Sequence, residues 1–531
     1  MTFLLILIAL VLVLGVLLGR LSDHVGIPVL LAFLALGMVF GSDGLFKIPF
    51  ENFDFASQIS TVALIFIIFY GGFGTNWKAA RPVALPAVLL STAGVVLTAL
   101  FTGVFCHFVL RLSWLESLLL GAVISSTDAA SVFSILRSKR LSLKYGTASL
   151  LELESGSNDP FAYMMTFLLL RMMSGGVTGG EVALLAFRQI FFGLACGAAL
   201  AWAAVRLFRK LRHDPAAVPL MTVAVALLSY ALPTALGGNG YLSAYLVGIV
   251  LGNQKFSDKK AMVTFLDGVA SLMQIALFFL LGLLSSPSRL PACLPAALAI
   301  MLFLTLVSRP AATFLLLTPF RAPLRQQVVV SWAGLRGATS IVFAIMAVID
   351  QAQTHGDLFH IVFCVVLLSI GLQGTFLPWC ARRMDMIDEQ EDVLRTFTDY
   401  TADTPVQFIR LRIHQDHPWN GVPLRQAVLP PDTRAALILR GDARILPRGD
   451  TCLCAGDVLI LSAMAYQDDR HLSLSETILD RKHEWCGKRL SEIDWGGSLV
   501  ILVRRGEEAL LPTGSLELCP GDTLVMASDP G

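Results

Sequence analysis

Two acidic residues of this chain lie inside stretches that are otherwise apolar enough to cross a lipid bilayer. Asp128 lies within residues 121–136 and Asp159 within residues 154–165, on successive apolar segments. An ionised carboxylate at membrane depth is energetically costly, so such residues usually mark the path of an ion or a proton. The sequence therefore predicts that these two acids carry the chemistry of the molecule.

Asp128 follows three hydroxyl-bearing residues in the middle of its segment. Ser125, Ser126 and Thr127 compete with the backbone for hydrogen bonds and loosen a helix locally. A helix interrupted in this way can present backbone carbonyls and helix-end dipoles to a cation near the membrane midplane. The alternative is that Asp128 caps the start of a helix at the lipid–water boundary, although apolar residues flank it on both sides.

Asp159 belongs to a segment with several polar side chains at helical spacing. In a helix, Ser155 and Asp159 share one stripe, and Glu154 and Asn158 share the adjoining stripe. Oxygen ligands of this kind suit hard cations. The alternative is an N-terminal helix cap whose acids complement the helix dipole. That alternative explains a single acid more easily than it explains Glu152, Glu154 and Asp159 together.

Two arginines also lie in apolar sequence and need partners. A guanidinium stays charged in proteins, so Arg309 and Arg336 have to pair with a carboxylate or with the carbonyls of a helix end. Glu154 is the favoured partner and Glu152 the alternative. Extension of the side chain to the membrane surface is a further alternative, better suited to Arg309 than to Arg336. The glycines and hydroxyls around Arg336 match the composition of residues 125–131, which indicates a counterpart in an inverted repeat.

The composition is that of an integral membrane protein. The 531 residues are 55% hydrophobic and only 15% charged, whereas a soluble globular protein carries about 25% charged residues. The net charge of +1 gives no argument for a nucleic-acid partner. The nine cysteines follow no zinc-site spacing and are interpreted as reduced packing residues.

Apolar blocks fill the chain up to residue 383, and the remainder has the composition of a soluble domain. A span needs roughly 20 apolar residues. The N-terminus lacks the basic start and the cleavage site of a signal peptide, so its first block is predicted to be a retained span. Thirteen spans are predicted, at residues 2–19, 26–42, 57–73, 82–109, 115–136, 150–173, 182–207, 217–236, 240–253, 264–285, 291–317, 327–349 and 358–380.

Basic residues are concentrated in alternate connections between these spans, for example at residues 137–144, 206–212, 255–260 and 382–383. Basic loops stay on the cytoplasmic side. This places the N-terminus outside and the C-terminal domain in the cytoplasm, and the odd number of spans predicts the same arrangement.

Three segments closely resemble the NhaP-type branch of the bacterial monovalent cation/proton antiporters, which are relatives of the sodium/hydrogen exchangers. They are SSTDAASVFSILR, ELESGSNDPFAYM and SWAGLRGATSIVFA, and the resemblance covers about residues 1–383. It implies an all-α membrane domain in a homodimer, with a fixed dimerisation domain and a core in which broken fifth and twelfth spans cross.

The resemblance also implies roles for individual residues. Asp159 would hold a cation and a proton in turn, with Asp128, Ser155 and the Thr127 carbonyl as further ligands. Asn158 matches the neutral member of an Asn-Asp pair, which implies electroneutral, one-for-one exchange. Glu154 and the two arginines would form the charge pair of the core. No enzyme activity, cofactor or resident metal is expected, and the partners are K+ or Na+, H+ and membrane lipid.

The chain departs from the family pattern in its third predicted span. Many relatives carry an acid immediately before two glycines, whereas this chain has Tyr70 before Gly71 and Gly72. A cation ligand from this span is therefore not expected.

The C-terminal part contains an internal repeat, which follows a predicted linker at residues 384–404. Residues 440–463 contain RGDARILP and GDVLILSA, and RGEEALLP and GDTLVMA follow 65 residues later. Apolar residues alternate around Gly-Asp turns, which predicts two small strand-rich α/β units at residues 405–465 and 466–531. Cys452 and Cys454 are placed on a strand, facing the same side.

Both units resemble the C-terminal subdomain of RCK-type regulators of potassium conductance, which sense small ligands and dimerise. No G-x-G-x-x-G motif precedes a helix, so the nucleotide-binding half of such regulators is expected to be absent. The resemblance favours K+ over Na+, because RCK-type domains accompany potassium transport.

Together these features predict a K+/H+ or Na+/H+ antiporter of the plasma membrane, active in pH and potassium homeostasis and in cell volume regulation. The alternatives are a Na+(Li+)/H+ antiporter or a ligand-gated potassium channel. A channel needs a TVGYG-type filter, which this sequence lacks. An intramembrane aspartyl protease would also use two acids, but without cation ligands around them.

Overall fold

The computed structural model describes two units of this chain, Met1–Ala402 and Asp403–Gly531. The described residues are 9–15, 17, 29–139, 141–175, 178–210, 217–254, 259–350, 356–388 and 406–528, the last range with short gaps at 416, 428, 430–432, 442, 465–472, 480–482, 494, 496–497, 506–507 and 511. Most of the first predicted span and of the predicted linker therefore lies outside the described residues.

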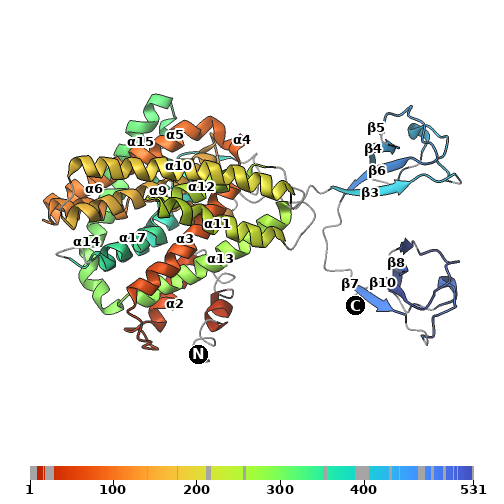
Figure 1. The fold of residues 1–531 in the computed structure, drawn as a ribbon, viewed down its shortest axis with the longest axis horizontal. Coiled ribbons are helices and arrows are strands. Elements are labelled where there is room, and N and C mark those ends of the chain that lie inside the picture. Colours follow the sequence, from red (N-terminus) through yellow and green to blue (C-terminus); the bar gives the residue numbers. More distant parts are fainter. Residues whose placement is uncertain are drawn as a thin grey trace. The chain divides into compact units, whose positions relative to one another are not determined.

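The first unit is helical (Figure 1). Seven of its described helical stretches are long and apolar enough to cross a membrane, and four shorter apolar helices accompany them. In the described part of the chain, each of the twelve predicted spans from residue 26 onward overlaps one or more helices. The helices are α2 Val29–Phe40, α3 Phe53–Gly74, α4 Trp77–Ala80, α5 Ala84–Leu89, α6 Val95–Val109, α7 Trp114–Val123, α8 Ala129–Ser138, α9 Thr147–Met173, α10 Gly179–Lys210, α11 Ala217–Ala235, α12 Gly240–Gly252, α13 Lys259–Leu284, α14 Leu290–Phe303, α15 Arg309–Leu317, α16 Leu324–Trp332, α17 Ala338–Ile349, α18 Leu358–Leu368 and α19 Gly374–Arg383.

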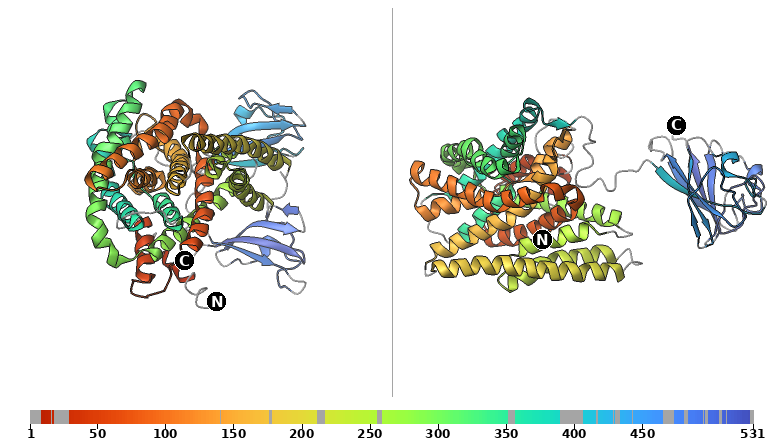
Figure 2. Two further views of the ribbon diagram at one scale, coloured as in Figure 1. Left: turned by 60° about the vertical axis from the view of Figure 1, so that its left-hand side comes forward. Right: turned by 90° about the horizontal axis from the view of Figure 1, so that it is seen from above.

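These helices pack in two groups, whose bundled arrangement Figure 2 shows from two further directions. Helices α2, α3 and α10–α13 contact one another and form the group that we call the scaffold. Helices α5–α9 and α14–α19 form the second group, which we call the core. Helices α9 and α17 of the core also contact the scaffold. Helix α9, which carries Glu154, Ser155, Asn158 and Asp159, thus lies at the boundary between the groups.

The fifth and twelfth predicted spans are both broken in the middle. Residues 124–128 separate α7 from α8, and residues 333–337 separate α16 from α17. The two breaks contact each other, because the Asp128 amide donates to the Leu335 carbonyl over 2.8 Å. The break expected from the serines and threonine at 125–127 and its counterpart around Arg336 are therefore both present.

A π-helical turn at Leu304–Ser308 leads into α15. Pro310, the second residue of α15, has no N–H to donate to the preceding turn, so a regular α-helix loses a hydrogen bond there. The Ser308 hydroxyl donates to the Thr98 carbonyl of α6 over 3.1 Å. This irregular turn fixes the start of α15, where Arg309 is located.

A short two-stranded sheet joins the end of the last helix to the loop before α9. β1 Ser142–Leu143 pairs with β2 Ile387–Asp388 in antiparallel register. Asp385 also forms ion pairs with Lys144 at 3.1 Å and with Arg325 at 3.0 Å. Lys144 lies in the loop just before α9. The segment that follows α19 is therefore held against the start of the helix that carries Asp159.

The second unit contains two four-stranded antiparallel sheets with matching strand order, β3-β6-β4-β5 and β7-β10-β8-β9. The predicted strand-rich repeat is therefore present, and the described helical part of each copy is a single 3-10 turn, at Leu424–Gln426 and at Leu490–Glu492. The strands are β3 Val406–Arg412, β4 Arg434–Arg440, β5 Ala443–Ile445, β6 Val458–Met464, β7 Ser473–Ile478, β8 Ser498–Arg505, β9 Glu508–Leu510 and β10 Asp522–Ser528.

The same ion pair recurs in both copies, between a buried aspartate and an exposed arginine side chain. Arg440 donates to both carboxylate oxygens of Asp457 at 2.8 Å, and Arg505 binds Asp522 with the same two distances. The Arg440 side chain holds the pKa of Asp457 below its ordinary value through these hydrogen bonds. The prediction of a strand at Cys452 and Cys454 is wrong, because only an isolated bridge from Cys452 to Pro423 forms there, and both thiols are exposed.

Candidate cation and proton site

Asp159 on α9 is contacted from both broken spans. The Ser126 hydroxyl, in the first break, donates to Oδ1. The Thr339 hydroxyl, at the second position of α17, donates to Oδ2 over 3.3 Å. Asp159 stays partly exposed while most of the polar residues around it are buried. Any species that binds this carboxylate therefore acts on both broken spans together.

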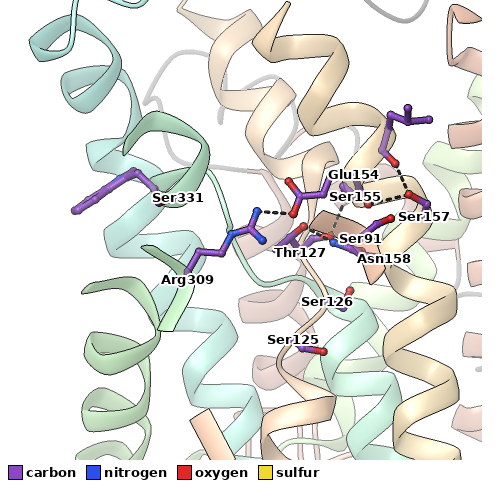
Figure 3. A network of polar contacts seen from close by, with 12 residues as sticks. Ser91, Ser125, Ser126, Thr127, Glu154, Ser155, Ser157, Asn158, Arg309 and Ser331 are labelled. Atoms are coloured by element: carbon purple, nitrogen blue, oxygen red, sulfur yellow. Dashed lines mark hydrogen bonds and ion pairs between the residues drawn. The ribbon is translucent and has the colours of Figure 1, made fainter. Parts of the chain in front are cut away.

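Thr127 connects the first break to α9 by two further hydrogen bonds. The Ser155 hydroxyl donates to the Thr127 carbonyl over 2.7 Å, and Asn158 Nδ2 donates to the Thr127 hydroxyl over 2.5 Å. Figure 3 shows these side chains turned toward one another. Asn158 is fully buried, and its Oδ1 has no hydrogen-bond partner among the described residues. Hydroxyl, carbonyl and amide oxygens thus converge beside Asp159.

Asp128 caps the helix that starts after the first break. Its Oδ1 accepts from the Ser131 amide over 3.3 Å, and its Oδ2 accepts from the Ser131 hydroxyl over 2.5 Å. The capping role left open by the sequence is therefore present, within the fifth span. Gly337 makes room for this carboxylate, because a Cβ there would lie 2.4 Å from Asp128 Oδ2. The structure thus places Asp128 against the second break.

Arg336 binds the carbonyls that the first break leaves free. Its NH1 donates to the Ser125 carbonyl over 2.6 Å and to the Ser126 carbonyl over 2.8 Å. Arg336 is fully buried, and its Nε and NH2 have no hydrogen-bond partner in the described part of the chain. The positive guanidinium satisfies helix-end carbonyls that would otherwise be unpaired in a low-dielectric region. Arg336 therefore fastens the second break to the first.

Glu154 pairs with Arg309 rather than with Arg336. Arg309 NH2 lies 2.5 Å from Glu154 Oε1, and both side chains are at most 3% exposed. This burial excludes extension of the Arg309 side chain to the membrane surface. Figure 3 shows Arg309 reaching toward Glu154 on α9. Gly334 allows this approach, because a Cβ there would lie 2.8 Å from Arg309 Nε.

The structure brings the predicted residues into one region and adds two residues that hydrogen-bond to Asp159 and that the sequence did not indicate. Ser126 belongs to the predicted hydroxyl run, but only its contact with Asp159 distinguishes it from Ser125. Thr339 lies in the segment whose composition indicated a second break. Its spacing in the sequence gave no sign that it meets Asp159 on α9.

Glu152, the alternative partner for the arginines, is buried on α9 next to Leu153, whose carbonyl accepts from the Tyr245 hydroxyl of α12 over 3.5 Å. Tyr70, where relatives carry an acid, donates to Asp267 Oδ1 over 2.7 Å. Asp267 belongs to α13, so this contact lies within the scaffold.

The comparison with protein families is decisive for the membrane unit. The model of the transmembrane sodium/hydrogen exchanger matches residues 6–383, which is well over half of the chain. The chain belongs to this family. A model of the TrkA-C domain matches residues 474–531, the second of the two repeats.

Characterised relatives cover both units. The chain is 35% identical over 460 residues to the K(+)/H(+) antiporter NhaP2 of Shewanella sp. (strain MR-4), covering 85% of this chain and 79% of that protein. It is also 35% identical over 449 residues to the K(+)/H(+) antiporter NhaP of Alkalimonas amylolytica, with 84% and 78% covered. The protein is thus a monovalent cation/proton antiporter, a transporter and not an enzyme.

Solved structures agree on the fold. The sodium proton antiporter MjNhaP1 from Methanocaldococcus jannaschii at pH 8 superposes with a TM-score of 0.63 at 24% identity, over 72% of this chain and 99% of that one. The antiporter fold, with its paired broken helices, is therefore the framework that positions the site described above.

Proposed function

We propose that this antiporter exchanges K+ for H+, one for one, by alternating access, and that cation and proton compete for Asp159. The observation that carries the proposal is the contact of both broken spans with this one carboxylate, through Ser126 and Thr339. Cation binding would turn both hydroxyl oxygens toward the ion, whereas a proton on Asp159 would remove the negative charge that attracts it. Each species therefore excludes the other.

The Asn158-Asp159 pair supports a one-for-one exchange. Asn158 is fully buried and neutral, so Asp159 is the one acid of this pair that can hold a proton or attract a cation. A single monovalent cation or a single proton balances its charge. Burial of an uncompensated charge is costly, so the empty ionised site would cross the membrane region less readily than the loaded one. Asn158 adds no further charge.

The remaining residues have distinct roles in this proposal. Asp128, Ser155, Asn158 and the Thr127 carbonyl supply further oxygen atoms around the cation, consistent with the preference of alkali cations for oxygen ligands. The Glu154–Arg309 pair joins α9 to α15 and keeps the core in one piece while it moves. No step requires a resident metal or cofactor.

Potassium is the favoured cation because the relatives that match both units are named K(+)/H(+) antiporters. The second candidate is Na+(Li+)/H+ exchange. Its support is a Na(+)/H(+) antiporter, NhaS2 of Synechocystis sp., which is 27% identical over 340 residues and covers 60% of this chain.

The orientation and regulation belong to the same proposal. The basic loops place the N-terminus outside and the two C-terminal repeats in the cytoplasm of a plasma-membrane protein. We expect a homodimer through the scaffold. The match of the second repeat to the TrkA-C domain supports control of transport by a small cytoplasmic ligand.

The deciding experiment is fluorescence dequenching of a pH probe in everted membrane vesicles. K+, Na+ and Li+ are added separately over pH 6–9, with wild-type protein and Asp159→Asn. We expect saturable, K+-dependent proton flux that the variant lacks. Flux unaffected by Asp159→Asn would contradict the assigned site, and a response confined to Na+ and Li+ would favour the second candidate.

A further inference from the structure

Each of the two breaks is contacted by the membrane span that follows it in the chain. The first break meets α9 at Ser155 and Asp159. The second break meets the helical stretch that runs from α18 into α19, at Ser369 and Gln373. In both spans the second residue follows the serine by four positions, which is one turn of a helix. The same spacing of polar side chains therefore occurs beside each break.

Ser369 and Gln373 lie on an irregular turn in the middle of their span. A π-helical turn covers Ser369–Gln373 and joins α18 to α19. Such turns inside α-helices are frequent at functional sites. Both side chains are buried, at 1% and 3% exposed. A buried carboxamide is costly unless it is hydrogen-bonded, so the partners of Gln373 indicate what this turn does.

Gln373 binds the helix end that precedes the second break. Its Nε2 donates to the carbonyl of Trp332, the last residue of α16, over 2.6 Å. The indole Nε1 of Trp332 donates in return to the Gln373 carbonyl over 3.0 Å. The last carbonyls of a helix have no partner within that helix. Gln373 therefore supplies a donor that the interrupted span no longer provides.

Ser369 binds the other side of the same break. Its hydroxyl accepts from the Arg336 amide over 3.0 Å and donates to Gln373 Oε1 over 3.0 Å. The same Gln373 oxygen accepts from the Thr305 hydroxyl over 3.4 Å. Ser369 and Gln373 thus bridge the second break from the Trp332 carbonyl to the Arg336 amide, through groups that belong to the protein alone.

Equivalent positions meet in the two halves of the membrane unit. Thr127 and Arg336 are each the fourth residue of their five-residue break. The Ser155 hydroxyl donates to the Thr127 carbonyl over 2.7 Å, and the Ser369 hydroxyl accepts from the Arg336 amide over 3.0 Å. The two serines therefore correspond to each other, as expected for an inverted repeat.

By the same correspondence, Gln373 occupies in the second half the position of Asp159 in the first. The two side chains differ in charge and in exposure. Asp159 is a carboxylate that stays partly exposed, whereas Gln373 is a buried, neutral carboxamide whose own N–H reaches the Trp332 carbonyl. Gln373 leaves no charge for a cation or a proton to balance. The second break is thus held by an internal donor, and the first faces the ion.

We infer that Gln373, together with Ser369, is a positioning residue of the antiporter. The pair fixes the second break in the shape that brings Thr339 to Asp159 and Arg336 to the carbonyls of the first break. It acts through these residues and does not touch the ion. The inference rests on the proposed exchange and adds to it the side chains that hold the second broken span in place.

The test uses full-length protein in everted vesicles and measures the half-saturating K+ concentration of proton flux, with Na+ titrated in parallel. Gln373→Met keeps the length of the side chain and removes the donor to the Trp332 carbonyl. We expect the half-saturating concentration to rise about tenfold, because a buried carbonyl is left unpaired and both Thr339 and Arg336 lose their support. An unchanged value would overturn the proposal.

A double variant separates positioning from a general structural role. Thr339→Val alone should raise the half-saturating concentration about fivefold. In the Gln373→Met background the same change should raise it less than twofold, because Thr339 no longer reaches Asp159. Residues that act independently give additive effects. A fivefold rise in both backgrounds would therefore overturn the proposal.

Two further variants complete the test. Thr305→Val is the matched control, because it removes a hydroxyl that contacts the same Gln373 oxygen and leaves the hydrogen bonds to the second break. It should leave the half-saturating concentration unchanged, and a tenfold rise would overturn the proposal. Ser369→Ala removes the acceptor of the Arg336 amide and should raise the concentration about fivefold, again less than additively with Thr339→Val.

The unfolding temperature of each purified variant shows whether it is folded. Should Gln373→Met fail to fold, Ser369→Ala and its combination with Thr339→Val decide the question, and full additivity there would overturn the proposal. Absence of cation-dependent proton flux in the wild type would instead contradict the proposed function. The two failures are therefore distinguishable.

Discussion

The two units of this protein differ in how completely the charged groups around their buried carboxylates are satisfied. In the C-terminal repeats, Asp457 and Asp522 each accept two hydrogen bonds from an arginine and one from a backbone amide, all at 2.8 Å. In the membrane unit, buried atoms of the charged cluster have no hydrogen-bond partner among the described residues. These atoms are Glu154 Oε2, Arg309 Nε, Arg336 Nε and Arg336 NH2.

This difference distinguishes ion pairs that stabilise a fold from charged groups proposed to take part in transport. A fully satisfied carboxylate with a low pKa, like that of Asp457, gains nothing from a further cation or proton near neutral pH. An incompletely satisfied network in a low-dielectric region is costly: the Glu154 oxygen lacks a donor, and the arginine nitrogens lack acceptors, among the described residues. In the proposed mechanism the membrane site binds and releases ions, whereas the repeated pairs hold each small sheet together.

The largest expected effect in this comparison comes from Asp159→Asn. The amide keeps the size of the side chain but cannot hold a proton or offer a negative charge to a cation. We expect cation-dependent proton flux to fall at least a thousandfold, with the protein still folded, because the variant also removes the cost of a buried charge. Vesicle flux and thermal unfolding measured side by side would test this. A residual flux above a tenth of the wild-type value would contradict the role proposed for Asp159.

Glu154→Gln should mainly destabilise the membrane unit. It leaves Arg309 as a buried cation without its carboxylate, a change that typically costs about 3–5 kcal/mol. The measurement is the unfolding temperature of the purified protein in detergent. Glu154→Gln combined with Arg309→Met is the matched control, since removal of both charges should recover most of the loss. A double variant as unstable as the single one would argue against a simple ion pair.

Asp457→Asn and Asp522→Asn should destabilise the second unit by about 1.5–3 kcal/mol each, the usual range for hydrogen bonds to charged groups. The two variants should behave alike and leave vesicle antiport measurable. The folded-state pKa of each carboxyl is lowered, so its contribution is present above the unfolded value near 3.8 and is lost as pH falls through the lower folded value. Tryptophan fluorescence during acid unfolding reports this, and a loss beginning above pH 6 would contradict the role.

Thr339→Val should have the smallest effect. It removes one hydroxyl that lies 3.3 Å from Asp159 and keeps the shape of the side chain. We expect the half-saturating cation concentration to rise about fivefold, as for the loss of one hydrogen bond. Thr339→Ser should restore it. An unchanged half-saturating concentration in Thr339→Val would show that the second broken span does not contribute to the ion site.

Much of the candidate site could be predicted because its residues are charged or polar side chains within otherwise apolar segments. A carboxylate such as Asp128 or a guanidinium such as Arg309 stands out at membrane depth, since the bilayer makes each charge costly. Helical spacing also placed Ser155 and Asp159 on one stripe of α9. The internal repeat was visible because equivalent turns need equivalent residues at the same offset.

The pairing of these residues was decided by the tertiary structure. The sequence left Glu154 with two arginines to choose from, and the packing of α15 against the second break selects Arg309. The sequence assigned Thr339 no role, because no local pattern in the sequence relates α17 to α9.

The sequence by itself thus determined the membrane unit, its two breaks and its charged residues, since these follow from the cost of placing polar groups in lipid. Only the tertiary structure decided which group meets which. Contacts between residues as distant in the sequence as Ser126 and Asp159, or Glu154 and Arg309, depend on how helices pack, and packing is a property of whole surfaces rather than of any local pattern.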